Sequence, residues 1–312
     1  MSDHPAIAQV LVDFVPTKDY FVGIDSDGCA MDAMDIKHLE CFTPSYIKGW
    51  DLQPVSTLAR ETAVFVNLHS ITRGLNRWLA LRQVLDLLRD RTEVAERGVV
   101  IPDYPELTEF IDSKHPLSDK GIAAFAAENP SPVADRMIAW GDEVNARIAD
   151  MVHGAGPFPG VREAIELMYD KVDEMVVSAT PIEALTREWG EHGLDKYMHV
   201  IAGQEMGGKA QHVRYAAKGK YPDDHIMLIG DAPGDRDAAA QEGVCYYPIN
   251  PGHEKESWAR FRDEALGKFL DGTFKGDYQK ALIEEFESYL PGEVPWETVS
   301  GNKTITMPKV KS

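Results

Sequence analysis

Short, continuous runs of apolar residues recur along the chain and predict buried β-strands. Small, polar or acidic residues follow each run, and stretches with a helical spacing of apolar positions come next. Continuous rather than alternating apolar runs are typical of strands that are covered on both faces, as in a parallel sheet. The predicted strands are residues 20–24, 175–177, 198–202, 226–229 and 245–249.

Helices are predicted between these strands. Thr180 followed by Pro181 is typical of a helix start, and Gly243 is typical of a helix end. The alternation of helix and strand through this part of the chain predicts an α/β fold with a doubly wound, Rossmann-like parallel sheet. The predicted helices are residues 160–169, 182–189, 210–217, 235–241, 256–270 and 278–290.

The interval from residue 36 to residue 154 has a different pattern. Leu68, Ile71, Leu75 and Leu79 begin a helical stripe, and no strand-like run of similar quality interrupts the interval. We therefore expect a mostly helical domain inserted between the first strand and the rest of the sheet. The expected domains are a discontinuous core, residues 1–35 and 155–290, a helical insertion, residues 36–154, and a C-terminal tail, residues 291–312.

Charge narrows the range of partners. The 312 residues carry 51 Asp+Glu against 32 Lys+Arg, a formal net charge of −19. A chain with this negative charge repels nucleic acids and anionic membrane surfaces. We therefore expect neither nucleic acid nor membrane as a partner. An anionic ligand would need a cation beside it.

Cysteine usage and the start of the chain favour a cytoplasmic protein. Cys29, Cys41 and Cys245 show no paired spacing and leave one cysteine unmatched in any disulfide scheme, which fits a reducing compartment. Asp3 lies where a signal peptide would carry basic residues, and no apolar stretch is long enough to span a bilayer. The sequence does not indicate an oligomeric state.

The first predicted strand ends in two acidic residues, Asp25 and Asp27. Residues i and i+2 of an extended segment project to the same side, so both carboxylates can face one point beyond the carboxyl edge of the sheet. Two like charges held so close need a cation or a shared proton. Taken alone, such a pair is more often a solvated turn.

A second acidic cluster changes this interpretation. Asp231 and Asp235 follow the predicted strand 226–229, so they belong to the same edge of the sheet. Carboxylate and carbonyl oxygens without histidine or cysteine favour Mg²⁺. For Asp235 the alternative is that its side chain only caps the helix that begins there.

Two further groups of candidate site residues follow predicted strands. Ser178 ends the predicted strand 175–177, and its hydroxyl and the neighbouring backbone N–H groups can donate to phosphate oxygens. Thr180 is a helix N-cap candidate and a weaker candidate for contact with substrate. Lys209 follows two glycines, where its ammonium would neutralise the charge that the acidic residues and a phosphate accumulate, although a lone loop lysine is usually solvated.

The order and spacing of these residues resembles the four motifs of the haloacid dehalogenase-like (HAD) hydrolase superfamily. The resemblance covers residues 18–35 and 155–250 and rests on Asp25-Ser26-Asp27-Gly28, Ser178, Lys209, and Gly230-Asp231 with Asp235. The helical insertion corresponds to the position of the family's C1 cap domain. The resemblance implies a Mg²⁺-dependent phosphatase that acts on a small phosphorylated metabolite.

The resemblance also implies a role for each residue. Asp25 is the expected nucleophile that forms an aspartyl-phosphate, and Asp27 is the expected general acid and base. Ser178 and Lys209 are expected to hold the transferring oxygens. The Mg²⁺ ligands are expected to be Asp25, the backbone carbonyl of Asp27, Asp231 and Asp235.

The insertion supplies candidate specificity residues. Arg73 and Arg77 lie four apart on a predicted helix, hence on one face, and could reach a distal anion of the substrate. The more ordinary interpretation is a solvated basic face beside the abundant acids.

Two rival functions remain open at this stage. A sugar phosphomutase of the same superfamily shares the Asp25 and Asp27 pair. A non-catalytic scaffold that uses the helical insertion as an interaction surface belongs to a different class, and intact candidates at every motif argue against it.

Overall fold

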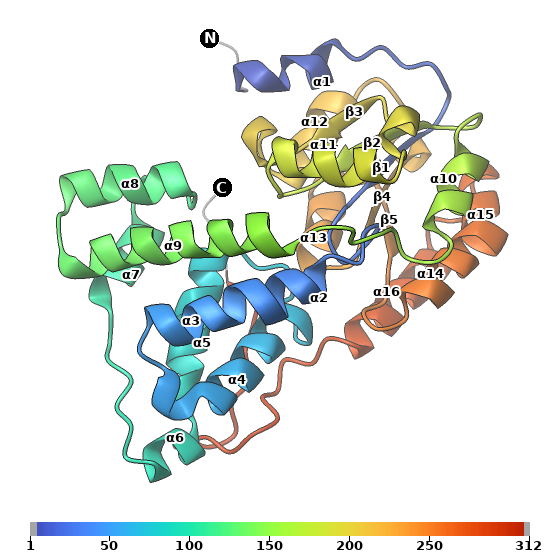
Figure 1. Cartoon of the computed structure of the whole chain (residues 1–312). Coiled ribbons are helices and arrows are strands. Elements are labelled where there is room, and N and C mark those ends of the chain that lie inside the picture. The colour runs from blue at the N-terminus through green and yellow to red at the C-terminus, as the bar shows by residue number, and fades with distance from the viewer. Residues whose placement is uncertain (1–4, 309–312) are drawn as a thin grey trace. The chain divides into compact units, whose positions relative to one another are not determined.

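A computed structural model of the chain describes residues 5–308 and divides into two compact units (Figure 1). The α/β unit contains the described residues up to Met34 together with His153–Tyr289. The helical unit contains Asp35–Val152 together with the described residues from Leu290 onward. The chain therefore passes from one unit to the other three times.

The α/β unit is built on a five-stranded sheet in the order β3-β2-β1-β4-β5, with every neighbouring pair parallel. The predicted doubly wound α/β fold is therefore confirmed. Each strand was expected to be buried on both faces, and most strand residues are. The strands are β1 (Phe21–Ile24), β2 (Asp173–Val177), β3 (Val200–Ala202), β4 (Ile226–Gly230) and β5 (Cys245–Pro248).

Strand β2 begins two residues earlier than the apolar run predicts. Its first residue, Asp173, is fully buried because Thr17 Oγ1 donates to its Oδ1 at 2.5 Å and Tyr221 donates to its Oδ2 at 2.6 Å. The second residue, Glu174, is also buried. Charged residues are poor candidates for a buried strand, and the partners that stabilise Asp173 are distant in the sequence.

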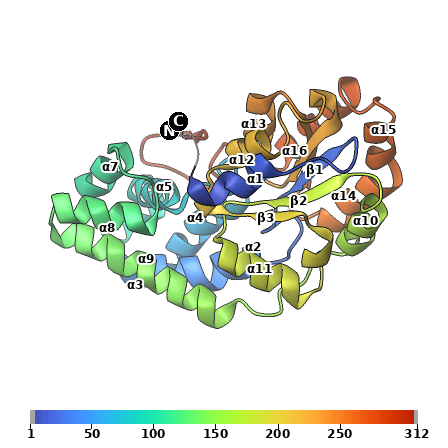
Figure 2. The same ribbon diagram turned by 90° about the horizontal axis from the view of Figure 1, so that it is seen from above.

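Helices cover both faces of the sheet, as the view in Figure 2 shows for α12 and α13 on one side and α10 and α11 on the other. The side chains of Val22, Ile24 and Val176 pack with α10, α11 and α14 in one apolar cluster. The helices of this unit are α1 (Gln9–Asp13), α10 (Val161–Met168), α11 (Ile182–Glu191), α12 (Lys209–Ala216), α13 (Pro233–Glu242), α14 (Glu254–Arg260), α15 (Leu266–Leu270) and α16 (Asp277–Ser288).

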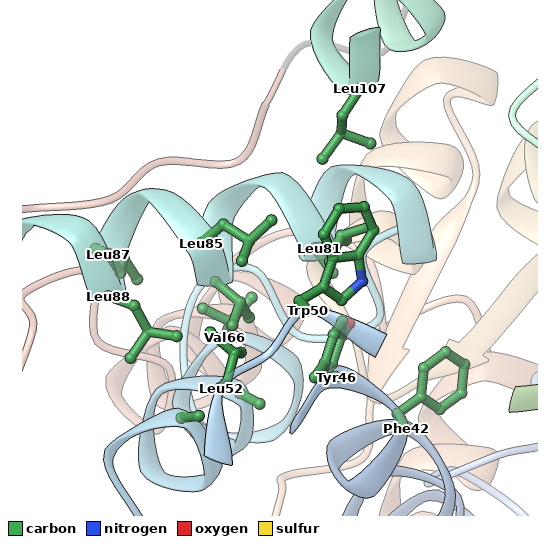
Figure 3. Packing of buried hydrophobic residues seen from close by; sticks show 14 of the residues in the cluster. Phe42, Tyr46, Trp50, Leu52, Val66, Leu81, Leu85, Leu87, Leu88 and Leu107 are labelled. Carbon is green, nitrogen blue, oxygen red and sulfur yellow. The ribbon is translucent and has the colours of Figure 1, made fainter. Parts of the chain in front are cut away.

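The helical unit has its own core, centred on aromatic side chains. Trp78 and Trp140 are fully buried and meet edge to face, with ring centroids 5.2 Å apart. Figure 3 shows Tyr46 and Trp50 beside the leucines of one helix. The helices are α2 (Met34–Ile36), α3 (Thr43–Gly49), α4 (Ser56–Leu68), α5 (Arg77–Asp90), α6 (Thr92–Glu96), α7 (Pro105–Asp112), α8 (Asp119–Glu128) and α9 (Pro132–Met151), with a π-helical stretch at Lys37–Phe42.

The C-terminal residues, expected to form an extended tail, pack into the helical unit. The carboxylate of Asp90 accepts hydrogen bonds from the backbone N–H of Ser300 at 3.0 Å and from Lys303 at 2.9 Å. The guanidinium of Arg91 lies over the ring of Trp296, 4.6 Å from its centroid. Val294 is buried in the core of the unit. These contacts make the segment a structural part of the unit.

No helix within residues 5–308 combines the length and the apolar character that crossing a membrane requires. The three cysteines, all within this range, are buried and form no disulfide.

Candidate active site

The loop after β1 carries the first acidic pair and is fixed by backbone hydrogen bonds. Asp25 N–H donates to the carbonyl of Ile229 in β4 at 2.9 Å, which continues the ladder one residue past the strand. The N–H of Ser26 donates to Asp25 Oδ1 at 2.8 Å. Gly28 has a φ of 77°, which allows the chain to turn back sharply. Asp25 is buried, and Asp27 is partly exposed.

Two tryptophan indoles hold the same loop from the side. Trp189 of α11 donates from Nε1 to the hydroxyl of Ser26 at 3.0 Å, and Trp258 of α14 donates from Nε1 to the carbonyl of Cys29 at 2.9 Å. Both indoles are fully buried. Sequence reasoning missed these residues because a tryptophan on an amphipathic helix has the same pattern whether or not its N–H anchors a loop.

The second acidic pair follows β4 at a tight turn. A side chain at Gly230 would overlap the carboxyl group of Asp235, so the close approach of the two requires glycine. Asp235 Oδ2 accepts a hydrogen bond from the N–H of Ala232 at 3.1 Å, which caps helix α13. Oδ1 of the same carboxylate lies 2.5 Å from Lys209 Nζ. Asp235 therefore caps its helix and also faces the cluster, so the two interpretations are compatible.

Three carboxylates meet beyond the sheet edge. Asp25, Asp231 and Asp235 each offer an oxygen that lies within 4.8 Å of the other two, and all three residues are buried. Three buried carboxylates repel one another unless positive charge lies between or beside them. Their hard oxygen donors fit Mg²⁺. Within residues 5–308 the sheet topology thus brings together Asp25, Asp231 and Asp235, whereas the Asp27 side chain is not part of this cluster.

Lys209 supplies one such positive charge. Its Nζ lies 2.7 Å from Asp25 Oδ2 and 2.5 Å from Asp235 Oδ1. Burial lowers the pKa of the Lys209 ammonium, but the charges and hydrogen bonds of Asp235 and Asp25 outweigh burial and raise the pKa above its ordinary value. Burial raises the pKa of the Asp235 carboxyl, which Lys209 opposes. The solvated-loop interpretation of Lys209 is therefore wrong, because the lysine opens α12 with its side chain in the acidic cluster.

Ser178 and Thr180 follow β2 at the same edge. Ser178 is buried, and its N–H donates to the carbonyl of Ala202 in β3 at 3.0 Å. Its hydroxyl oxygen accepts from the N–H of Thr180 at 3.2 Å, so the hydroxyl hydrogen of Ser178 can point elsewhere. Thr180 Oγ1 donates to Asp27 Oδ2 at 2.8 Å. The side chain of Thr180 therefore contacts the second acid of the first loop.

Arg73 and Arg77 do not share a helix face, so that expectation is wrong. Helix α4 ends at Leu68 and α5 begins at Arg77, and Arg73 lies in the turn between them. Asn76 caps α5 by accepting from Trp78 N–H at 3.0 Å, and its extended backbone separates the two arginines. The apolar spacing of Leu68, Ile71, Leu75 and Leu79 runs across this break, although Gly74 and the cap residue Asn76 are signals for it.

The two arginines have different surroundings within the helical unit. Arg73 is buried, and its guanidinium donates to the carbonyl of Leu68 at 2.9 Å. Arg77 donates to the side-chain oxygen of Asn145 at 2.9 Å and lies 3.6 Å from the carboxylate of Asp119. Neither belongs to a solvated basic face. Contact of either with substrate stays a prediction.

A surface cavity of about 480 Å³ lies at the opposite, amino edge of the sheet, with Thr17, Tyr20 and His225 in its lining. The side chain of Lys220 beside it donates to three backbone carbonyls at the end of α1, those of Leu11, Val12 and Phe14. The cavity is therefore separate from the acidic cluster.

Comparison with known proteins gives matches among solved structures. No protein-family model matches the chain, and no curated protein does. A haloacid dehalogenase-like family hydrolase from Streptococcus pneumoniae is 13% identical with a TM-score of 0.42, over 78% of this chain and 91% of that one. A predicted phosphoglycolate phosphatase from Haemophilus somnus is 13% identical with a TM-score of 0.46, over 77% and 88%. CbbY from Rhodobacter sphaeroides, in complex with phosphate, is 17% identical with a TM-score of 0.37, over 73% and 86%.

Proposed function

We propose that this chain is a Mg²⁺-dependent phosphatase that hydrolyses a small phosphorylated metabolite through an aspartyl-phosphate on Asp25. The observation that carries the proposal is the position of the Asp25 carboxylate, which shares a buried site with Asp231 and Asp235 and contacts the ammonium of Lys209. Such a carboxylate is held in place, beside positive charge, where an anionic phosphoryl group can be bound.

In the first step, an oxygen of Asp25 attacks phosphorus and forms the P–O bond of the aspartyl-phosphate. The bond between phosphorus and the substrate's ester oxygen breaks, and its electron pair goes to the leaving oxygen. Asp27 gives its proton to that oxygen, because an alkoxide is a poor leaving group. The alcohol is the first product.

In the second step, Asp27 takes a proton from a water molecule while the water oxygen attacks phosphorus. The P–O bond to Asp25 breaks and returns its electron pair to the carboxylate, which releases inorganic phosphate. Two displacements with one carboxylate and one proton shuttle thus complete hydrolysis and restore the resting state.

The remaining residues of the proposed site stabilise negative charge. Lys209 neutralises part of the negative charge on the transferring oxygens, and the hydroxyl of Ser178 donates a hydrogen bond to one of them. Asp25, Asp231, Asp235 and the backbone carbonyl of Asp27 would hold Mg²⁺. When bound, the ion supplies the positive charge that reduces repulsion between a carboxylate nucleophile and a phosphate dianion.

The test is phosphate release from p-nitrophenyl phosphate and from an alkyl phosphate such as glycerol phosphate, with Mg²⁺ and with EDTA. We expect turnover that requires the metal and that Asp25→Asn reduces by at least about 10³-fold, because the nucleophile is lost. Absence of turnover from both esters in the presence of Mg²⁺ would contradict the proposal and favour a scaffold. Slow hydrolysis beside rapid isomerisation of a sugar phosphate would favour the phosphomutase.

A further inference from the structure

The side-chain hydroxyl of Thr180 lies against the proposed general acid rather than in open solvent. Thr180 Oγ1 donates to Asp27 Oδ2 at 2.8 Å, and the two residues are 153 positions apart in the sequence. The hydroxyl has one hydrogen, and this contact uses it. Because Oδ2 accepts this bond whether or not Oδ1 carries a proton, the contact restrains the orientation of the Asp27 carboxyl group in both states.

The backbone of Thr180 is fixed from two directions. Its N–H donates to the hydroxyl of Ser178 at 3.2 Å, and its carbonyl accepts from the N–H of Gln204 at 3.1 Å. Gly203 packs so closely that a Cβ at that position would lie 2.6 Å from the carbonyl oxygen of Thr180. The residue that follows, Pro181, has a restricted φ. The hydroxyl of Thr180 is therefore presented from a rigid position.

This arrangement links three segments of the proposed site. Asp27 belongs to the loop after β1, Thr180 to the loop after β2, and Gln204 to the short helix Gln204–Met206 that precedes Lys209. Placement of an acid to within a fraction of an ångström decides how well it transfers a proton. A rigid donor from a neighbouring strand end provides such placement without touching the substrate.

We propose that Thr180 is a positioning residue that holds the carboxyl group of Asp27 in the orientation from which it protonates the leaving oxygen. The proposal rests on the function proposed above. It gives Thr180 a role through Asp27 in place of direct contact with substrate. It predicts that losing the hydroxyl matters most where the leaving group needs a proton.

The test compares two esters in the full-length chain with Mg²⁺. Thr180→Val keeps the shape of the side chain and removes the hydroxyl. We expect kcat for glycerol phosphate to fall about 10- to 100-fold and kcat for p-nitrophenyl phosphate to fall less than about 3-fold, with KM unchanged, because p-nitrophenolate leaves without a proton. Thr180→Ser restores the hydroxyl and should return the alkyl rate to within about 3-fold of the wild type.

Two controls accompany this comparison. Thr186→Val removes an exposed hydroxyl from helix α11 and should change neither rate. Asp27→Asn should show the same preference for the aryl ester as Thr180→Val, but a larger loss. Circular dichroism and melting temperature show that each variant is folded.

Several outcomes would overturn the proposal. Equal losses of kcat on both esters would indicate a general structural role, and a raised KM with unchanged kcat would indicate direct contact with substrate. Failure of Thr180→Ser to recover the alkyl rate would exclude the hydroxyl as the cause. Each of these results leaves an active wild type, whereas a wild type that hydrolyses neither ester refutes the proposed function and the role of Thr180 together.

Discussion

The ammonium nitrogen of Lys209 lies 2.7 Å from Oδ2 of Asp25. The contact joins the start of α12 to the end of β1, two places that are far apart along the chain. It puts a buried cation beside the carboxylate that is proposed to attack phosphorus. Because the same ammonium reaches Asp235 at 2.5 Å, it balances two of the three acids of the cluster.

Replacing Lys209 by methionine should lower kcat/KM for a phosphate ester by about 10²- to 10³-fold, because one group that stabilises negative charge in the transition state is removed. The measurement is steady-state kinetics with saturating Mg²⁺. Lys255→Met, at an exposed position on α14, is the matched control and should leave kcat/KM unchanged. A loss smaller than about 3-fold for Lys209→Met would show that this cation takes no part in the reaction.

Asp231→Asn should weaken Mg²⁺ binding by about 100-fold or more, because one of three clustered carboxylates becomes a neutral amide. Isothermal titration calorimetry with Mg²⁺ alone measures this affinity without any assay of activity. Asp237→Asn removes an exposed carboxylate on the neighbouring helix α13 and is the control. Equal Mg²⁺ affinity in the two variants would mean that Asp231 is not a ligand.

Glu174 makes stability depend on pH. Within residues 5–308 neither of its carboxylate oxygens has a hydrogen-bond partner, and burial raises the pKa of its carboxyl to about 9. The folded state therefore keeps a proton that the unfolded state loses above its ordinary pKa of 4.5, so the free energy of unfolding falls as the pH rises between these values. The slope is about 1.4 kcal/mol per pH unit.

Glu174→Met should remove this slope. From pH 5 to pH 7 the free energy of unfolding of the variant should rise by about 2–3 kcal/mol relative to that of the wild type, because methionine has no titrating proton. Urea unfolding at both pH values measures the difference. Glu183→Met, at an exposed position of α11, is the control: its free energy of unfolding should differ from that of the wild type by the same amount at both pH values. A constant difference for Glu174→Met would contradict a protonated, buried carboxyl group.

Trp296→Ala should destabilise the helical unit by about 2–3 kcal/mol, because the ring packs on the core and on the guanidinium of Arg91. Its centroid also lies 5.3 Å from that of Phe65. Thermal unfolding and limited proteolysis of the full chain measure the loss. Val299→Ala changes an exposed residue of the same segment and should have little effect. If the two variants unfold at the same temperature and are cleaved at the same rate, the ring of Trp296 does not contribute to the stability of the helical unit.

Much of the α/β unit could be predicted because each of its strands contains a continuous run of apolar residues, most of them buried. Continuous apolar runs located all five strands, and their order along the chain placed Asp25 and Asp231 at the ends of two strands. Parallel topology then brings those ends to one edge, which is why residues more than 200 positions apart lie together. Their chemical roles remain a prediction.

Other features depend on contacts that leave no periodic signal. Asp173 can occupy a buried strand because Thr17 and Tyr221 donate hydrogen bonds to its carboxylate, and neither partner is recognisable from the local sequence. The break between Arg73 and Arg77 is set by the cap at Asn76. The segment after Tyr289 has neither helical nor strand periodicity, so its packing on Arg91 and Asp90 could not be foreseen.

The return of the chain to the helical unit after α16 has a practical consequence for dissecting this protein. A gene fragment that encodes residues 35–152 would produce a helical unit without the segment that contains Val294 and Trp296, both of which pack on its core. Excising that fragment from the gene would likewise leave the α/β unit attached to a stretch that has lost its binding surface. To obtain the helical unit on its own, residues from 290 onward therefore have to be fused to residues 35–152.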